Sequence, residues 1–89
     1  MGNSTELPIV FSRHALDQMV ERGAIESEVI QTIRDGERLP AKKNRTAYRR
    51  NMSYQGVWGG TVYTTKQLMA IVAEEDHQIV VVTVYVFYF

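Results

Sequence analysis

The last eleven residues, IVVVTVYVFYF from Ile79 to Phe89, constrain the fold more than any other feature of this 89-residue chain. The run is apolar and rich in β-branched residues, which suit the pleated, half-buried surface of a sheet. It is too short to cross a bilayer as a helix, because a spanning helix needs about 20 apolar residues. The run therefore predicts a final β-strand.

Alternation along this run divides its side chains between two faces. One face carries only valine and is predicted to pack under helices. The opposite face carries Thr83 and Tyr85 in an otherwise apolar row, and it is expected to stay uncovered as a substrate platform or a partner-binding surface, since a large exposed apolar patch usually marks an interface. The valine face consists of Val80, Val82, Val84 and Val86.

Two helices are predicted before the sheet. In FSRHALDQMVERG, Ser12 suits the N-cap position and Gly23 the left-handed position that ends a helix, so the first helix is expected at about residues 13–22. The second helix covers SEVIQTIRDGE and closes at Gly36, with Glu28 near the positive end of its dipole. Only a few residues join the two helices, which predicts an antiparallel hairpin.

The remaining sequence predicts strands. Residues 48–54 alternate in polarity, VWGGTVYTT is expected to be a strand with a bulge at Gly59-Gly60, and QLMAIVA precedes the turn EEDHQ and the last strand. The predicted fold class is α+β, with an N-terminal two-helix hairpin packed on one face of a roughly four-stranded antiparallel sheet. Residues 1–9 are expected to form a flexible tail, and residues 10–89 a single domain.

Composition excludes several functions. Ten basic and ten acidic residues cancel, and the absence of cysteine excludes disulfides and thiolate metal sites. We interpret the residues around His77 as a hairpin turn without a metal, because consecutive residues cannot easily converge on one ion. No P-loop, dinucleotide fingerprint or secretory signal is present, so we expect a cytoplasmic protein with no cofactor and no membrane partner.

Charge is balanced in total but not in position. Six of the ten basic residues lie between Arg38 and Arg50, with no acidic residue among them. Guanidinium groups bind phosphate through paired hydrogen bonds, and aromatic rings stack on unpaired bases, so this segment is typical of a small RNA-binding surface. An ordinary solvated loop is the alternative. The candidate RNA-binding residues here are Lys42, Lys43, Arg45, Tyr48 and Arg50.

His14 is the candidate proton-transfer group. It falls at the second position of the first helix, where the helix dipole disfavours imidazolium and helps to keep a neutral base available near pH 7. The alternative is a solvated histidine on a polar helical face. Spacing alone does not decide between these two interpretations.

FSRHALDQMVERG, SEVIQTIRDGE and the terminal VVVTVYVF together resemble DUF4258, a family of small bacterial proteins whose outline is HAxxRMxERGI, a second helix ending near Gly-Glu, and VxTVY. The resemblance covers roughly residues 10–86. That family is in turn similar to RelE-like toxins of the barnase–colicin–RelE ribonuclease fold, which implies metal-independent RNA cleavage. Carried over by position, the implied functional residues are His14, Arg22, Arg45, Arg49, Thr83 and Tyr85.

The chain departs from the family outline at two positions. Gln18 stands where the outline has its first arginine, which removes a cation beside His14 and weakens activity unless Arg22 takes its place. Ala24 stands where isoleucine is usual.

Three functions remain open. In the first, the chain is a metal-free ribonuclease of toxin type, in which His14 acts as general base or acid. Arg49 neutralises the phosphate with Arg22 in support, and Tyr85 and Thr83 orient the substrate or donate a proton. A toxin of this kind implies a cognate antitoxin protein. In the second, the chain is a non-catalytic interaction module that forms a homodimer through its C-terminal strand. In the third, it binds RNA without cleaving it.

Overall fold

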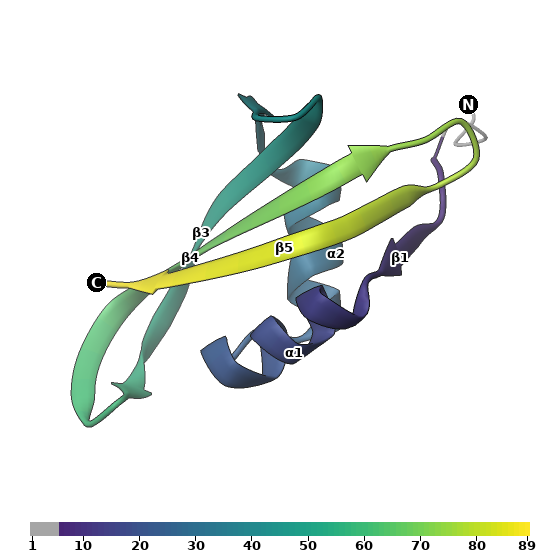
Figure 1. Ribbon diagram of the computed structural model, residues 1–89. Coiled ribbons are helices and arrows are strands. Elements are labelled where there is room, and N and C mark those ends of the chain that lie inside the picture. Colours follow the sequence, from purple (N-terminus) through teal and green to yellow (C-terminus); the bar gives the residue numbers. More distant parts are fainter. Residues whose placement is uncertain (1–5) are drawn as a thin grey trace.

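The computed structural model describes residues 6–89, which form two helices and one five-stranded sheet (Figure 1). The strand order across the sheet is β1-β5-β4-β3-β2. No helix among these residues is long and apolar enough to cross a membrane. The elements are β1 (Ile9–Phe11), α1 (Arg13–Arg22), α2 (Glu26–Asp35), β2 (Glu37–Ala41), β3 (Arg45–Trp58), β4 (Thr61–Glu74) and β5 (Ile79–Tyr88).

Helix α1 lies where its capping residues predict it. The Ser12 hydroxyl accepts a hydrogen bond from the Ala15 amide at 3.0 Å, and the helix ends at Gly23, whose φ is +82°. A side chain at Gly23 would also collide with Trp58 and Tyr88, because a Cβ atom there would lie 2.7 Å from each of them. Gly23 is therefore required both by the backbone conformation and by the close approach of the sheet.

Helix α2 also has the predicted extent, although its N-cap residue, Ile25, has no side-chain acceptor. The Glu28 carboxylate instead accepts a hydrogen bond from the Ile25 amide at 3.1 Å, which satisfies one of the free donors at the helix start. Figure 1 shows α1 following the line of β5, while α2 crosses the sheet. The two helices pack mainly against the sheet, α1 on β5 and α2 on β3 and β4.

The predicted class, α+β, is confirmed, and the strands from β2 to β5 pair antiparallel, but the sheet has five strands and is mixed. Strand β1 pairs with β5 in parallel, Ile9 opposite Ile79. The prediction of one strand over VWGGTVYTT is wrong, because Gly59 and Gly60 form the turn between β3 and β4, both with positive φ. Strand β2 was not predicted from the sequence.

The predicted valine face of β5 is only half correct: Val84 and Val86 lie under the helices, but Val80 lies on the opposite face and Val82 forms a bulge. The pairing register between β4 and β5 shifts at Val82: Thr83 pairs with Ile71, whereas Val81 pairs with Val72. This bulge reverses the alternation, since an extra residue moves every later side chain to the other face. The helices consequently cover Ile79, Val81, Val84, Val86 and Tyr88, three of which have no exposed surface or nearly none (Val81 0%, Val84 0% and Ile79 8%).

The N-terminal tail predicted for residues 1–9 falls partly outside the described residues. Within residues 6–9, Leu7 and Ile9 pack against the hydrophobic core. The Pro8 carbonyl accepts a hydrogen bond from the Ile79 amide at 2.9 Å, so the chain joins the sheet before residue 10.

Candidate functional site

The two helices leave one face of the sheet uncovered, and we call it the helix-free face. Cross-strand partners in a sheet point to the same side, and three rows of partners on β3, β4 and β5 define this face. Two of the residues that β5 contributes to these rows are well exposed, Tyr85 at 41% and Phe87 at 47%. The rows are Ala47–Ile71–Thr83, Arg49–Met69–Tyr85 and Asn51–Gln67–Phe87.

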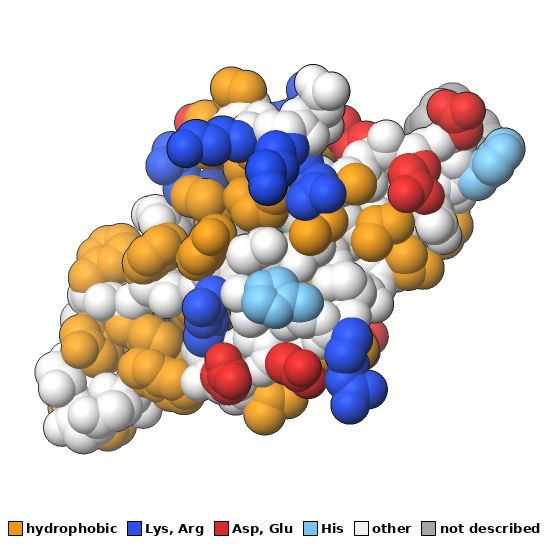
Figure 2. Space-filling model, in the orientation of Figure 1, with side chains coloured by type: hydrophobic (Ala, Val, Ile, Leu, Met, Phe, Trp, Pro, Cys, Tyr) orange, Lys and Arg blue, Asp and Glu red, His pale blue; other side chains and the backbone are white. Residues whose placement is uncertain are grey.

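The middle row brings two predicted catalytic residues together. Arg49 and Tyr85 are separated only by Met69, so their Cα atoms lie two strand spacings apart, about 10 Å. Figure 2 shows Lys and Arg side chains gathered beside a band of hydrophobic side chains on this side of the molecule. A phosphate and an unpaired base could therefore be contacted at the same time.

Arg49 keeps most of its hydrogen-bonding capacity for a ligand. Its Nη2 donates to Glu37 Oε1 at 2.7 Å, and the two side chains are 37% and 58% exposed. An exposed pair of this kind contributes little to stability, about 0–1 kcal/mol. A guanidinium has five N–H donors, and this is the only hydrogen bond that the Arg49 side chain makes among residues 6–89.

Helix α1 is fastened to the free edge of β5 by two side chains. Buried Gln18 accepts a hydrogen bond from the Val84 amide at 2.8 Å, and Arg22 Nη1 donates to the Val84 carbonyl at 2.7 Å. Together they supply the partners that a neighbouring strand would provide. The same arrangement places the Arg22 guanidinium 5.3 Å from the centre of the Tyr85 ring, within cation–π distance.

Gln18 therefore has a structural role, and Arg22 joins Tyr85 at the rim of the helix-free face. His14 lies on the same ridge of α1 as Gln18 and Arg22, one and two turns earlier, and its side chain is exposed. It has no hydrogen-bond or ion-pair partner in the part of the chain that the structure describes.

The basic segment does not form one surface. Lys42 and Lys43 lie exposed in the turn between β2 and β3, and Arg45 begins β3. Along β3, Arg49 belongs to the helix-free face, whereas the neighbouring residues Tyr48 and Arg50 alternate to the helix-covered face. The predicted RNA-binding residues are thus divided between the two sides of the sheet.

Tyr48 belongs to a polar cluster at one end of the sheet. Its hydroxyl donates to Glu74 Oε2 at 2.8 Å, while Arg38 and Thr46 donate to Oε1 at 2.7 and 3.0 Å. The hydrogen bond from Tyr48, followed by those from Arg38 and Thr46, lowers the pKa of Glu74 despite partial burial, and burial in turn raises the pKa of Tyr48. The carboxylate is held ionised with its oxygens occupied, so it is poorly suited to proton transfer.

A cleft of about 330 Å³ adjoins this cluster. Tyr48 and Glu74 line it together with Arg34 and the apolar side chains of Leu7 and Ile33. Arg34 already donates to the Leu7 carbonyl at 2.8 Å, so the polar groups around the cleft bind one another.

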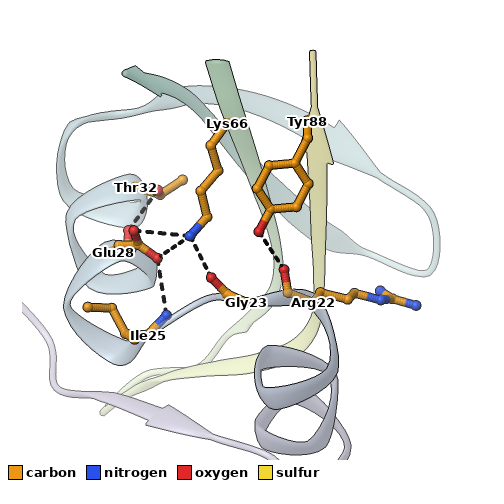
Figure 3. Close-up of polar contacts among 7 residues, drawn as sticks. All are labelled: Arg22, Gly23, Ile25, Glu28, Thr32, Lys66 and Tyr88. Carbon is orange, nitrogen blue, oxygen red and sulfur yellow. Dashed lines mark hydrogen bonds and ion pairs between the residues drawn. The ribbon is translucent and has the colours of Figure 1, made fainter. Parts of the chain in front are cut away.

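Lys66 is the most buried charged side chain of the sheet, with only 6% of its side chain exposed. Its Nζ donates to the Gly23 carbonyl at 2.5 Å and to both oxygens of Glu28 at 2.9 and 3.1 Å (Figure 3). Tyr88 adds a hydrogen bond to the Arg22 carbonyl at 2.8 Å. These bonds tie the connection between the helices to β4 and β5, and they leave Lys66 no donor for a ligand.

The sequence prediction missed Lys66 and Glu28, although a signal was present. Lys66 is in phase with Leu68, Ala70 and Val72, so the alternation of β4 directs it toward the core. A lysine at such a position requires a buried partner. The predicted strand began at Gln67, six residues after the observed start of β4 at Thr61, and therefore did not include Lys66.

Metal ligands are not clustered within residues 6–89, where no group of three or more His, Asp or Glu side chains is placed to hold an ion. His77 lies exposed in the turn before β5. The interpretation of that segment as a turn agrees with its position between β4 and β5.

These features define a small α+β protein with two helices on one face of a mixed five-stranded sheet and a partly apolar, partly cationic surface on the other. The family model described as "Domain of unknown function (DUF4258)" matches residues 11–86, and the chain belongs to this family. Neither the curated proteins nor the solved structures include a significant match to the chain.

Proposed function

We propose that the helix-free face binds single-stranded RNA and that the protein cleaves the bound strand by attack of a ribose 2′-hydroxyl on the adjacent phosphate. The row Arg49–Met69–Tyr85, with Arg22 beside the Tyr85 ring, is the observation that carries the proposal. It places two cations and an exposed aromatic ring on one surface. Proteins bind single strands by contacting the phosphates with cationic side chains and stacking the bases on exposed aromatic rings.

Binding is assigned first to Arg49. Its exposed guanidinium has only a surface ion pair with Glu37 to exchange for a phosphate, and the exchange costs little. Arg22 uses one donor on the Val84 carbonyl and keeps others for the ligand. Tyr85 and Phe87 have nearly parallel rings, 6.3 Å apart with planes 14° from one another, and they offer neighbouring surfaces on which bases stack.

Cleavage is a second step, and it is favoured by the position of His14 on the ridge of α1 that also carries Arg22. In this mechanism His14 accepts the proton of the 2′-hydroxyl, the 2′ oxygen forms a bond to phosphorus, and the bond to the 5′ oxygen breaks. Tyr85 or a water molecule returns a proton to the departing oxygen. Arg22 and Arg49 stabilise the charge that develops on the phosphate oxygens, and Thr83 positions the strand.

The test compares two adjacent arginines on opposite faces of β3. We expect Arg49→Ala to weaken binding of a fluorescent eight-nucleotide RNA at least fivefold and to reduce the salt dependence of the affinity by about one phosphate contact. Arg50→Ala is the matched control and is expected to change the affinity less than twofold. Equal effects of the two substitutions would remove the helix-free face from the proposal.

Cleavage is tested separately with a 5′-labelled RNA under single-turnover conditions. His14→Ala is expected to slow cleavage about 100-fold or more, because general acid–base catalysis contributes at least that much, and to leave binding unchanged. A loss of less than about threefold would exclude His14 from the mechanism and leave RNA binding alone.

A second candidate function, self-association, is favoured by the exposure of the C-terminal residues. Phe87 and Phe89 are 47% and 56% exposed on the same side of β5. A homodimer that covers them would sediment as a dimer and would dissociate on Phe87→Ser. A monomer at high concentration would contradict it.

A further inference from the structure

We propose that Asn51 and Gln67 form a site that reads the edge of an RNA base next to the phosphate held by Arg49. This inference rests on the proposed RNA binding, and it assigns recognition of a base to Asn51 and Gln67. Asn51, Gln67 and Phe87 are cross-strand partners on the helix-free face, one row beyond Arg49, Met69 and Tyr85.

The two amide groups are joined to each other. Gln67 Nε2 donates to Asn51 Oδ1 at 2.8 Å. This bond leaves Asn51 Nδ2 as a donor and Gln67 Oε1 as an acceptor, and reversing both amides would again leave one donor and one acceptor. Every base carries a donor beside an acceptor on an edge that is exposed in a single strand, so the pair has the chemistry to bind one.

A shallow hollow of about 480 Å³ lies next to the amide pair and is lined by Asn51. It occurs where the pairing of β3 and β4 shifts between Ser53 and Gly56, and Gln55 has a φ of +49° there. Bulges and positive φ values at non-glycine residues concentrate at functional sites, where they redirect side chains. Amide and hydroxyl groups line the hollow together with one thioether and one aromatic ring: Asn51, Met52, Ser53, Gln55, Thr64, Thr65 and Phe89.

The composition of this hollow favours a base over the other parts of an RNA strand. Within its lining there is no Lys or Arg to bind a phosphate. The nearest cation on the same face of β3 is Arg49, two residues from Asn51, which is about 7 Å along a strand. A phosphate on Arg49 therefore leaves a neighbouring base within reach of the amides, with the Phe87 ring beside it.

The test measures affinity for four fluorescent octamers of equal charge: oligo(A), oligo(U), oligo(C) and an abasic ribose-phosphate strand. We expect the wild-type protein to prefer one of the three bases by about tenfold, as a paired hydrogen-bond contact provides. The double variant Asn51→Ala/Gln67→Ala should reduce that preference to less than twofold. Phe87→Ala should weaken all three base-containing octamers alike, and Gln31→Ala, an exposed amide on α2, is the matched control.

The possible results separate this inference from the function on which it rests. Binding that depends on Arg49 but shows less than twofold preference among bases, or a preference that survives in the double variant, overturns the base-reading site alone. Absence of binding to all four octamers overturns both. Circular dichroism and thermal unfolding of each variant verify that a lost preference does not come from a lost fold.

Discussion

Two cations on opposite faces of the sheet show how differently this molecule uses positive charge. Lys66, on the helix-covered face, is 6% exposed and donates to the Gly23 carbonyl and both oxygens of Glu28. Arg49, on the helix-free face, is 37% exposed and has a single ion pair with Glu37. The buried cation is fully committed to the fold, whereas the exposed one is available to a ligand.

The difference between Lys66 and Arg49 indicates on which face of the sheet a ligand would bind. A buried charge must find its partners within the chain, because leaving it unpaired costs several kcal/mol. An exposed charge has no such requirement, so the position of Arg49 in one row with Met69 and Tyr85 needs another explanation. Substitutions on the two faces should consequently change different properties, stability on one and ligand binding on the other.

The largest loss of stability is expected for Lys66→Met, which keeps the apolar stem but removes the charge. Glu28 would lose its cation and the Gly23 carbonyl its donor, and we expect the free energy of unfolding to fall by about 2–4 kcal/mol. Arg49→Met is the control, with an expected loss below about 1 kcal/mol. Urea unfolding followed by circular dichroism measures both, and equal losses would contradict the contrast between the faces.

A slightly smaller loss is expected for Gly23→Ala. The left-handed conformation costs a residue with a Cβ about 1–2 kcal/mol, and displacement of Trp58 and Tyr88 adds to that cost, for a total of about 2–3 kcal/mol. Gly59→Ala separates the two contributions, because Gly59 also has a positive φ but has no atom within 4 Å of an added Cβ. Similar losses for the two variants would show that the close contact with the sheet contributes nothing.

The smallest effect is expected from the polar cluster around Glu74. Its hydrogen bonds lower the pKa of Glu74 below the ordinary value of 4.5. The ionised form is therefore favoured by folding, and this contribution is complete above pH 4.5 and is lost as the pH falls through the lowered folded pKa. The melting temperature of wild type should fall as the pH drops through that window, and Glu74→Gln should flatten this dependence.

Tyr48→Phe should also flatten the acid dependence, because the hydrogen bond from Tyr48 is the largest cause of the lowered pKa of Glu74. Glu75→Gln, in the adjacent exposed turn, is the control. If wild type and Glu74→Gln lose stability in parallel as the pH falls, the cluster does not contribute.

The positions of the helices and the composition of the two faces of the sheet were only partly predictable from the sequence. Helix ends were predictable because their determinants are local: Ser12, Gly23 and Gly36 mark them within one turn. The faces of β5 were not, because the bulge at Val82 occurs in a run of valines that carries no turn residue or charge. Strict alternation puts Val84 on the helix-covered face, where it lies. It puts Val81 on the opposite face, although Val81 is also fully buried under the helices.

The site was predictable as a list of residues but not as an arrangement. Arg49 and Tyr85 were both candidates, yet only the register of β3, β4 and β5 places them in one row. Gln18 was interpreted as a lost cation beside His14, whereas it accepts a hydrogen bond from Val84, 66 residues away in the chain. Contacts of such sequence separation have no local signal.

The most direct test of the contrast between the faces is NMR of side-chain methyl groups during titration with an eight-nucleotide RNA. Consecutive residues of β4 and β5 point to opposite faces, so each pair contains its own control. We predict that the methyl signals of Met69, Ile71 and Thr83 shift on binding, while those of Leu68, Val72 and Val84, which are fully buried, do not. Shifts confined to the second set, or equal in both, would contradict the assignment of function to the helix-free face.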